Sequence, residues 1–596
     1  MRVKRSIAVA LGVGLAITGL VACGTKNDNK KTGGTTTTVL NVGMPDGATL
    51  PANNNPYLDA SFARHLGYSW LIWEPLALQN EAKPSSDPTP WLATKWTWNS
   101  DYSSITLTVR DNVKWSDGST MTADDVAYSF QIMKDNKGVN YYALPITDVS
   151  VSGKDVTVKF DGSQYVNRTK ILSGTQVINK KQWSAMADPS KDTVANPIGT
   201  GPYKIKSVTP STVTLDVRTD YWQAAPKPTE IRFTTYSGND TQLPALTSGA
   251  TDWSFEFLAN AKTTFVAKDP AHFKLWFPPA LSADGLWINT TKKPFDNAHL
   301  RRAMSQVINR PDIFNQGEAG YFKPEIDNIT GIPLPAGDSF LAPQYKGKNS
   351  QTDVATAKKE LTDNGFTYAG TTLKDPTGKA VTLTLSDPAD WNDYQTDLAI
   401  IKDNLATIGI TATIDKANQD AWFDAVGKGN FDAVMHWTNG GATPYDMYEN
   451  IMNGAQLQPI GTTASGNYGR FNSAEATQAL KDYANAKDDA SRSAAMNKIE
   501  DIMVNEMPMI PTSAGNVGAE YSTKNWTGWP DETNPYAAIQ VTRWGMLDTV
   551  MHLQPFGEAL CVAPDLAFGQ ERHFLRDRAF LGRRQRQRRH QQGAKE

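Results

Sequence analysis

Apolar and polar residues alternate along this chain with two different periods, which predicts a mixture of strands and helices. Residues 105–109 and 213–217 alternate apolar with polar positions, the pattern of half-buried strands. In 398–408 apolar residues recur every three or four positions, and Gly409 follows as a helix stop. Thr122 with an acid three positions later predicts a helix start. Together these elements predict an α/β protein, with a last strand near 550–553.

The N-terminal segment has the pattern of a secretory signal peptide. Basic residues at 2–5 precede an apolar run at 7–20, which is shorter than the roughly 20 residues of a membrane-spanning helix. Cys23, with Leu20 three positions before it, resembles the bacterial lipoprotein box, whose Cys is diacylated and becomes the first mature residue. We expect a signal peptide at 1–22 and a lipid anchor on Cys23; the alternative is an ordinary signal peptide that contains a Cys.

Composition narrows the class of protein. The 596 residues suffice for two or more domains, and the formal net charge of -3 gives no reason to expect a nucleic-acid partner. Cys23 and Cys561 are the two cysteines, so a lipidated Cys23 leaves the main body without a thiol pair. Residues 23–38 are polar and rich in Gly and Thr, which predicts a flexible tether.

The C-terminal residues 556–596 differ from the rest of the chain. They include the basic run 583–590, which is polar and lacks an apolar period. We interpret this tail as a disordered or non-native extension unrelated to the fold. The alternative is a tail that binds an anionic polymer or lipid headgroups.

Four segments between residues 40 and 555 carry a family resemblance. Their most characteristic strings are WLATKW at 91–96 with DNVKWSDG at 111–118, PIGTGPY at 197–203, PFD at 294–296 with RRAM at 301–304, and NFD at 430–432 with Trp437. In this order they resemble the extracytoplasmic solute-binding proteins of peptide, nickel and oligosaccharide ABC importers (family 5, cluster C). The resemblance implies a monomeric receptor that delivers its ligand to membrane permease subunits, at the outer face of the cytoplasmic membrane.

The resemblance also implies a fold. Members have a two-lobed, type II periplasmic-binding-protein fold, with a hinge, a ligand cleft between the lobes and an extra subdomain in the first lobe. By analogy, lobe one comprises 39–75, 196–288 and 525–555, its subdomain 76–195, and lobe two 289–524.

The fourth segment bears on the ligand. Peptide-binding relatives often continue Trp-x-x-Asp, with the Asp holding the ligand's ammonium; here Gly440 stands in that place and Thr443 replaces a second frequent acid. A buried ammonium without a counter-charge would cost several kcal/mol. Residues 525–530 (NWTGWP) resemble the oligosaccharide-binding branch. The resemblance therefore implies a neutral, β-linked oligosaccharide of cello or manno type; the alternative is an oligopeptide.

Aromatic rings pack on sugar C–H faces, and planar amides bond hydroxyls. The candidate ligand-binding residues are Trp437, Trp253, Trp422 and Trp391 for packing, and Asn439, Asn53 and Asn54 for hydrogen bonding. Each has a structural alternative: the tryptophans could be core, Trp391 could staple a helix start, and the two Asn before Pro56 could build a turn. Trp526 and Trp529 are expected to pack lobe one.

Other classes of protein find less support. No hydrolase motif is present, and glycoside hydrolysis would need two carboxylates placed across a sugar, so we expect no enzyme. The 7 His form no metal-spaced constellation, which disfavours a nickel or haem role, and we expect no cofactor or metal. An adhesin would leave the four segments unexplained.

Overall fold

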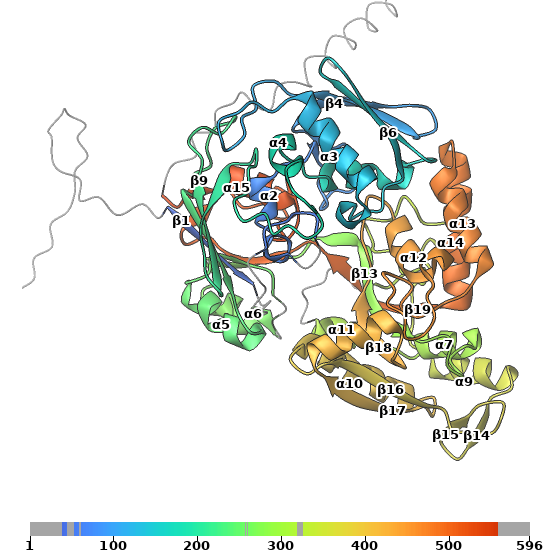
Figure 1. Cartoon of the computed structure of the whole chain (residues 1–596). Coiled ribbons are helices and arrows are strands. Elements are labelled where there is room, and N and C mark those ends of the chain that lie inside the picture. Colours follow the sequence, from blue (N-terminus) through green and yellow to red (C-terminus); the bar gives the residue numbers. More distant parts are fainter. Residues whose placement is uncertain are drawn as a thin grey trace, which may run out of the picture. The chain divides into compact units, whose positions relative to one another are not determined.

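Two β-sheets, one in each lobe, organise the computed structural model (Figure 1). It describes residues 38–44, 53–58, 61–256, 258, 260–318 and 326–557. The predicted signal peptide, Cys23, the tether up to Thr37 and the tail from 558 onward lie outside the described residues.

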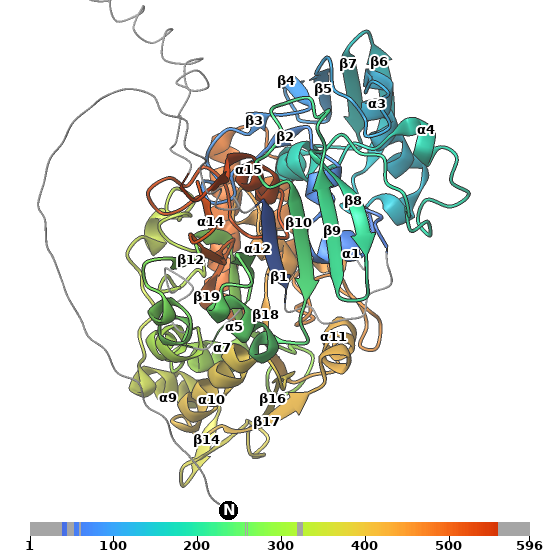
Figure 2. The same cartoon turned by 90° about the vertical axis from the view of Figure 1, so that its left-hand side faces the viewer.

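The sheet of lobe one has seven strands in the order β12-β20-β11-β1-β10-β9-β8, of which β1, β10, β9 and β8 run side by side in Figure 2. Its central strand β1 pairs in parallel with β10 and with β11. The strands are β1 (Val39–Met44), β8 (Tyr203–Val208), β9 (Thr212–Val217), β10 (Glu230–Thr235), β11 (Trp253–Ser254), β12 (Phe273–Trp276) and β20 (Ala519–Ser522). The helices of this lobe are α1 (Phe62–His65), α2 (Ser69–Ile72), α5 (Asn239–Ser248), α6 (Ala261–Thr264) and α15 (Gly545–His552).

The extra subdomain is built on a four-stranded antiparallel sheet, and α3 lies against it (Figure 1). Its strands are β4 (Ala93–Trp98), β5 (Ser104–Val109), β6 (Ile146–Ser152) and β7 (Asp155–Phe160), and its helices are α3 (Ala123–Asp135) and α4 (Lys180–Trp183). Three short pairs of strands lie outside the main sheets: β2 (Ala77–Leu78) with β3 (Thr89–Pro90), β14 (Thr367–Ala369) with β15 (Thr372–Lys374), and β21 (Trp526–Thr527) with β22 (Gln554–Pro555).

The sheet of lobe two has five strands in the order β17-β16-β18-β13-β19. They are β13 (Pro279–Ile288), β16 (Thr382–Pro388), β17 (Thr411–Ala417), β18 (Ala433–Trp437) and β19 (Met509–Asn516). The helices of this lobe are α7 (Ala298–Ser305), α8 (Arg310–Asp312), α9 (Val354–Asp363), α10 (Asn392–Ala406), α11 (Gln419–Lys428), α12 (Tyr445–Met452), α13 (Ala474–Asn485) and α14 (Asp489–Glu506).

The five-stranded sheet separates two apolar cores. Leu286 and Ile288 of β13 pack into the core that α7, α9 and α10 share, whereas Trp287 packs into the core on the side of α11 to α14. This alternation is the period of two that a strand imposes on its side chains. The same period places Asp284 of β13 on the α10 side of the sheet.

The chain passes between the two sheets twice, once from β12 to β13 and once from β19 to β20. Sheet membership therefore corrects two predicted lobe boundaries. The whole of β13 belongs to lobe two, so lobe one is left before Pro279 and not after Ile288. Strand β20 belongs to lobe one, so lobe two ends by Asn516 and not at Lys524.

Most of the predicted elements agree with the structure. The stretches 105–109 and 213–217 fall in β5 and β9, and α3 begins after Thr122, whose N–H donates to the Asp125 carboxylate at 2.9 Å. Helix α10 ends at Ala406, and Gly409 follows with a φ of 81°. The strand predicted at 550–553 is wrong, because Val550 lies in the last turn of α15.

Candidate functional site

Several residues that the sequence analysis selected as ligand-binding candidates lie at the edge of the lobe-two sheet where its parallel strands end. Strands β16 and β18 pair in parallel, and they end at Pro388 and Trp437. In open α/β sheets, ligands bind outside the carboxyl ends of the strands. Trp391 follows β16 by three residues, as the N-cap of α10. This edge, which we call the cleft edge of lobe two, is the first candidate site.

Three aromatic rings gather at this edge and form what we call the aromatic shelf: Trp391, Phe423 and Trp437. The Trp391 centroid lies 6.1 Å from that of Trp437 and 6.0 Å from that of Phe423. Phe423 and Trp437 are 43% and 41% exposed, which is unusual for such large apolar rings, and Trp391 is half-buried. The shelf therefore offers apolar faces to a ligand.

Two rings support the shelf from behind. Trp422 is buried, 5.0 Å from Trp391, and its indole N–H donates to the Ser386 carbonyl at 3.1 Å. His436 stacks on both Trp422 and Trp437, with ring centroids 5.3 and 4.2 Å away. Burial lowers the pKa of His436 to about 4, so this ring is uncharged near neutral pH. Trp422 thus holds the shelf in place and is not itself a surface for stacking.

Beside the shelf, between the sheet and α10, the apolar core gives way to buried carboxyl groups. The layer is formed by the end of β16, the first turns of α10, the middle of β13 and the residue after the π-helical turn η5 (Ile313–Gly317). We call this set the acid layer: Asp284, Glu318, Asp387, Asp393 and Asp397. Burial and mutual repulsion raise the pKa of Asp284 to about 7, and burial alone raises that of Asp393 to about 6.

The deeper part of the acid layer has few hydrogen-bond partners. No N–H or hydroxyl donates to either carboxyl of Glu318 and Asp397, which have one another as hydrogen-bond partners, and one oxygen of Asp387 also has no donor. The other oxygen of Asp387 accepts from the Met435 N–H at 2.9 Å. Burial, together with neighbouring carboxylates, raises the pKa of all three groups well above the usual range. Native proteins rarely bury several acids without a basic partner, so this layer is a candidate functional feature.

A small pocket lies where the lobes and the subdomain meet. It encloses about 30 Å³ and is lined by Gln79, Glu81, Pro84, Val166, Thr169, Lys170, Gly440, Gly441, Ala442, Asp446 and Trp544. Across it, the Lys170 ammonium of the subdomain pairs with the Asp446 carboxylate of lobe two at 2.8 Å. Asp446 lies directly against Gly441: a Cβ there would come within 1.9 Å of its Oδ2. The glycine at 441 thus makes room for a carboxylate in the cleft.

The aromatic shelf and the small pocket are connected by the residues that follow Trp437. Asn439 is exposed between Trp437 and the pocket, and its backbone N–H donates to the Asn450 side chain at 3.2 Å. Gly440, which occupies the place of the ammonium-binding Asp in peptide-binding relatives, lines the pocket. Four of the seven predicted ligand residues, namely Trp391, Trp422, Trp437 and Asn439, therefore come together in lobe two.

The other three predicted residues lie elsewhere, in lobe one. Trp253 is 0% exposed in the core, and its indole N–H donates to the Ile539 carbonyl at 2.9 Å. Asn54 is buried: its amide donates to the Val194 carbonyl and accepts from the Tyr68 hydroxyl. Asn53 is half-buried and accepts the Asn55 N–H, which builds a turn. The structural alternative fits these contacts: Trp253 bonds within lobe one, Asn54 bonds within lobe one and to the subdomain, and Asn53 builds a turn.

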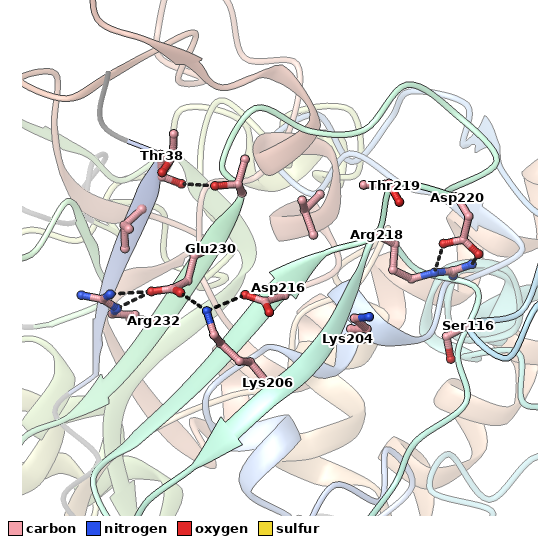
Figure 3. Close-up of a pocket in the computed structure, with 13 residues that line it drawn as sticks. Thr38, Ser116, Lys204, Lys206, Asp216, Arg218, Thr219, Asp220, Glu230 and Arg232 are labelled. Atoms are coloured by element: carbon pink, nitrogen blue, oxygen red, sulfur yellow. Dashed lines mark hydrogen bonds and ion pairs between the residues drawn. The ribbon is translucent and has the colours of Figure 1, made fainter. Parts of the chain in front are cut away.

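A larger hollow lies elsewhere in lobe one, at the edge formed by β8, β9 and β10 (Figure 3). It encloses about 500 Å³ and its walls are mostly charged. Lys206 pairs with Asp216 and Glu230 at 3.0 and 2.6 Å, and Arg218 is buried and donates to four backbone carbonyls. No aromatic ring lines this hollow, so it lacks the surface on which a sugar packs.

Two features of the site escaped the sequence analysis. Phe423 adjoins the predicted Trp422 in sequence, and helical geometry points the two side chains to different faces, so the exposed neighbour could have been found. The acid layer comes from four separate segments, and their convergence depends on tertiary structure. The sequence of β16 did contain a signal, because residues 383 and 385 are apolar and Asp387 occupies the next buried position of the same period.

Two lobes, each built on its own sheet, with two chain crossings and a pocket at their junction, define a two-lobed α/β binding protein. The chain belongs to the bacterial extracellular solute-binding proteins, family 5: the model of the family's middle region matches residues 87–458. It is thus the extracytoplasmic substrate-binding protein of an ABC importer, a class that binds and delivers solutes for transport. Among the residues described, no helix is long and apolar enough to cross a membrane.

Individual relatives differ in what their names say they bind. The glutathione-binding protein GsiB of Shigella flexneri is 24% identical over 88% of this chain and 96% of its own. The oligopeptide-binding protein OppA of Bacillus subtilis is 23% identical over 71% and 79%. A Thermotoga maritima binding protein solved with mannohexaose matches 87% of this chain and 99% of its own, with a TM-score of 0.76 and 24% identity. These likenesses establish the family and the fold and leave the ligand open.

Proposed function

We propose that this protein captures a β-linked oligosaccharide, of cello or manno type, between its lobes and delivers it to an ABC permease. The observation that carries the proposal is the aromatic shelf, whose exposed Trp437 and Phe423 rings lie at the cleft edge of lobe two. Sugar rings present apolar C–H faces to such surfaces. The exposed Asn439 amide beside the shelf supplies donors and acceptors for hydroxyls.

Two further parts of the proposal concern the setting. A diacyl anchor on Cys23 would hold the receptor at the outer face of the cytoplasmic membrane and raise its effective concentration near the permease. Ligand binding would shift the lobes toward a closed population that the permease recognises. We propose that the protein acts as a monomer. Growth with radiolabelled palmitate tests the anchor: wild type should be labelled, and Cys23→Ser should not.

The direct test of the ligand is titration calorimetry. Cello- and manno-oligosaccharides of two to five units should bind, and mixed peptides should not. Trp437→Ala should weaken sugar binding by about 1–3 kcal/mol, since a stacked face is lost. Phe556→Ala, which removes another exposed ring far along the chain, serves as the matched control and should bind like wild type. Binding of peptides alone would overturn the sugar assignment.

The second candidate function is oligopeptide binding, and one observation favours it. Asp446 places a carboxylate against Gly441 in the interlobe pocket, so the cleft does contain an acid near the substituted position 440. That carboxylate already holds the Lys170 ammonium. A peptide ammonium would have to displace Lys170, so Lys170→Met should admit peptides if this candidate is right and should leave sugar specificity intact if it is not.

A further inference from the structure

The extra subdomain contacts lobe two through the short segment 165–170, which follows β7 in the chain. Tyr165 and Val166, in the 3-10 turn η2 (Tyr165–Asn167), pack against the apolar core on the side of α11 to α14. The same turn contacts α13, whose end lies beside the subdomain in Figure 1. The subdomain therefore joins the two lobes at a second place, apart from the two chain crossings.

An aromatic ring and two cations form one end of this contact. The Tyr165 ring lies under the guanidinium group of Arg168, 3.9 Å from the ring centroid, and under that of Arg492 from α14, 3.6 Å from it. The Tyr483 ring of α13 meets Tyr165 edge-on, with centroids 6.3 Å apart. Arg492 is 6% exposed, and its Nε is buried without a hydrogen-bond acceptor. A cation so shielded from water is attracted strongly to the face of an aromatic ring.

An ion pair forms the other end of the contact. The Lys170 ammonium and the Asp446 carboxylate pair at 2.8 Å in the small pocket. Tyr445, next to Asp446, stacks on Tyr483 with ring centroids 5.4 Å apart, so the two ends are continuous within lobe two. We call the whole contact the clasp, and it consists of Tyr165, Arg168 and Lys170 of the subdomain and Asp446, Tyr483 and Arg492 of lobe two.

The subdomain is fixed to lobe one by a shared interior. Buried residues of lobe one and of the subdomain belong to one apolar core. The Glu74 carboxylate of lobe one accepts from the Trp91 indole of the subdomain at 2.7 Å, and the Arg218 guanidinium of lobe one donates to the Trp115 carbonyl at 3.1 Å. Domains that share a large apolar core move as one body. When the lobes separate, the subdomain must therefore stay with lobe one.

The two chain crossings lie together and can act as one hinge. The Val517 N–H of one crossing donates to the Pro278 carbonyl of the other at 3.2 Å. A Cβ on Gly518 would come within 2.4 Å of Phe277 Cα, so the crossings touch. Lobes joined by a few adjacent residues can rotate about them. A rotation that separates lobe two from lobe one must break the clasp, because each of its halves is held by a different lobe.

We propose that the clasp is a latch, through which the subdomain holds the closed lobes together and slows the release of ligand. Its parts are cation–π contacts and an ion pair whose lysine side chain is 33% exposed. Such interactions are strong enough to bias an equilibrium between open and closed lobes and too weak to prevent opening. The latch favours the closed state for any ligand in the cleft, so it goes beyond the oligosaccharide proposal and does not depend on it.

The first test needs no ligand. Tyr165→Ala removes the ring that both guanidinium groups face, so the closed population of the unliganded protein should fall. Small-angle scattering should then give a larger radius of gyration than for wild type. Arg492→Met, which keeps a long apolar side chain in this place, should change the radius in the same direction. A radius of gyration equal to that of wild type in both variants would overturn the latch.

The second test measures the release of ligand. Stopped-flow fluorescence with cellobiose and with cellopentaose gives association and dissociation rates. In Tyr165→Ala both sugars should dissociate at least about fivefold faster, with unchanged association rates, since the surface of the open cleft is intact. A changed preference between the sugars with an unchanged dissociation rate would place Tyr165 in the binding surface and contradict the latch. If neither sugar binds wild type, the oligosaccharide proposal falls and scattering decides the latch.

A control and a double variant show whether the clasp acts as a unit. The Lys524 ammonium also lies over a ring, 4.5 Å from the Phe273 centroid, and also pairs with an acid, Asp269, but all three belong to lobe one. Lys524→Met should therefore scatter and release ligand like wild type. The double variant Tyr165→Ala with Arg492→Met should release ligand little faster than either single variant, because both changes remove one contact. Independent, multiplying effects of the two changes would overturn the latch.

Discussion

Each lobe carries a tryptophan on a strand that pairs in parallel with a neighbour, yet the two rings have opposite surroundings. Trp253 on β11 is covered by the segment that carries Ile539 and packs edge-on against Trp529, with ring centroids 5.5 Å apart. Trp437 at the end of β18 has no such cover, and its ring is exposed. The difference teaches that a strand-end position makes a ring available only when no later part of the chain folds over it.

The largest expected effect separates these two tryptophans. Trp253→Ala should lower the free energy of unfolding by about 3–5 kcal/mol, since it empties a core site and removes a hydrogen bond. Trp437→Ala should change it by less than about 1 kcal/mol, because the ring is already partly in water. Urea denaturation of both variants measures this. Equal losses in the two would mean that Trp437 is a core residue, and the comparison would fail.

The two lobes should also differ in the pH range over which their acids affect stability. An acid whose folded-state pKa is raised stabilises the folded protein fully below its unfolded pKa, and the contribution is lost as pH rises through the folded pKa. For Asp393 this pH range runs from about 4 to about 6, and for Asp284 it runs from about 4 to about 7. Burial and the nearby Glu520 and Asp240 charges raise the pKa of Glu256 to about 10, so its range extends further.

Variants in which an amide replaces one of these acids should therefore change the free energy of unfolding over different pH ranges. Asp284→Asn should gain about 1–3 kcal/mol relative to wild type at pH 8 compared with pH 4, and most of that change should occur below pH 7. Glu256→Gln should show a relative gain that continues to grow between pH 7 and 9. Unfolding free energies measured from pH 4 to 9 test both. Identical pH profiles for the two variants would contradict the assignment of separate acid clusters.

A smaller effect is expected at the contact between subdomain and lobe two. Lys170→Met removes the partner of Asp446, a carboxylate that is largely buried, and should destabilise the contact between the subdomain and lobe two by about 1–2 kcal/mol. Small-angle scattering should show a larger radius of gyration than in wild type. The double variant Lys170→Met with Asp446→Asn should recover part of this, because the unpaired charge is gone. Full additivity of the two changes would show that the pair does not couple the lobes.

The smallest effect is expected in the charged hollow of lobe one (Figure 3). Lys206→Ala removes two ion pairs whose side chains are partly in water, so the free energy of unfolding should fall by at most about 1 kcal/mol. Ligand affinity should not change, since the hollow lies apart from the shelf. Calorimetry of this variant with the best ligand is the measurement, and a tenfold loss of affinity would move the binding site to lobe one.

Local patterns predicted many of the strands and helices, and they failed where a segment was too short to show its period. The period of two in β5 and β9 and the period of the helix in α10 are properties of neighbouring residues, so they could be read directly. The predicted strand at 550–553 failed because Val550 and Leu553, three residues apart, are both buried at the end of a helix, and four residues cannot distinguish the two periods.

Some parts of the candidate site could be predicted from the sequence, and others could not. The predicted residues Trp437 and Trp391 lie together at the cleft edge of lobe two, whereas the burial of Trp253 could not be predicted, because the segment of Ile539 that covers it lies 286 positions further along the chain. The acid layer could not be predicted at all from one-dimensional patterns. Its members are ordinary acids in sequence, and they become unusual only when β13, β16, α10 and η5 converge.

The position of β20 has a consequence for how the chain folds. This strand lies between β11 and β12 in the interior of the lobe-one sheet, although some 240 residues of lobe two separate it from β12. A chain that emerges N-terminus first therefore cannot complete that sheet until residues 519–522 have appeared. Lobe two, a continuous stretch from β13 to β19, can assemble beforehand. The strand order thus permits an inside-out sequence of folding, in which all strands of the inserted lobe are present before the sheet of lobe one can be completed.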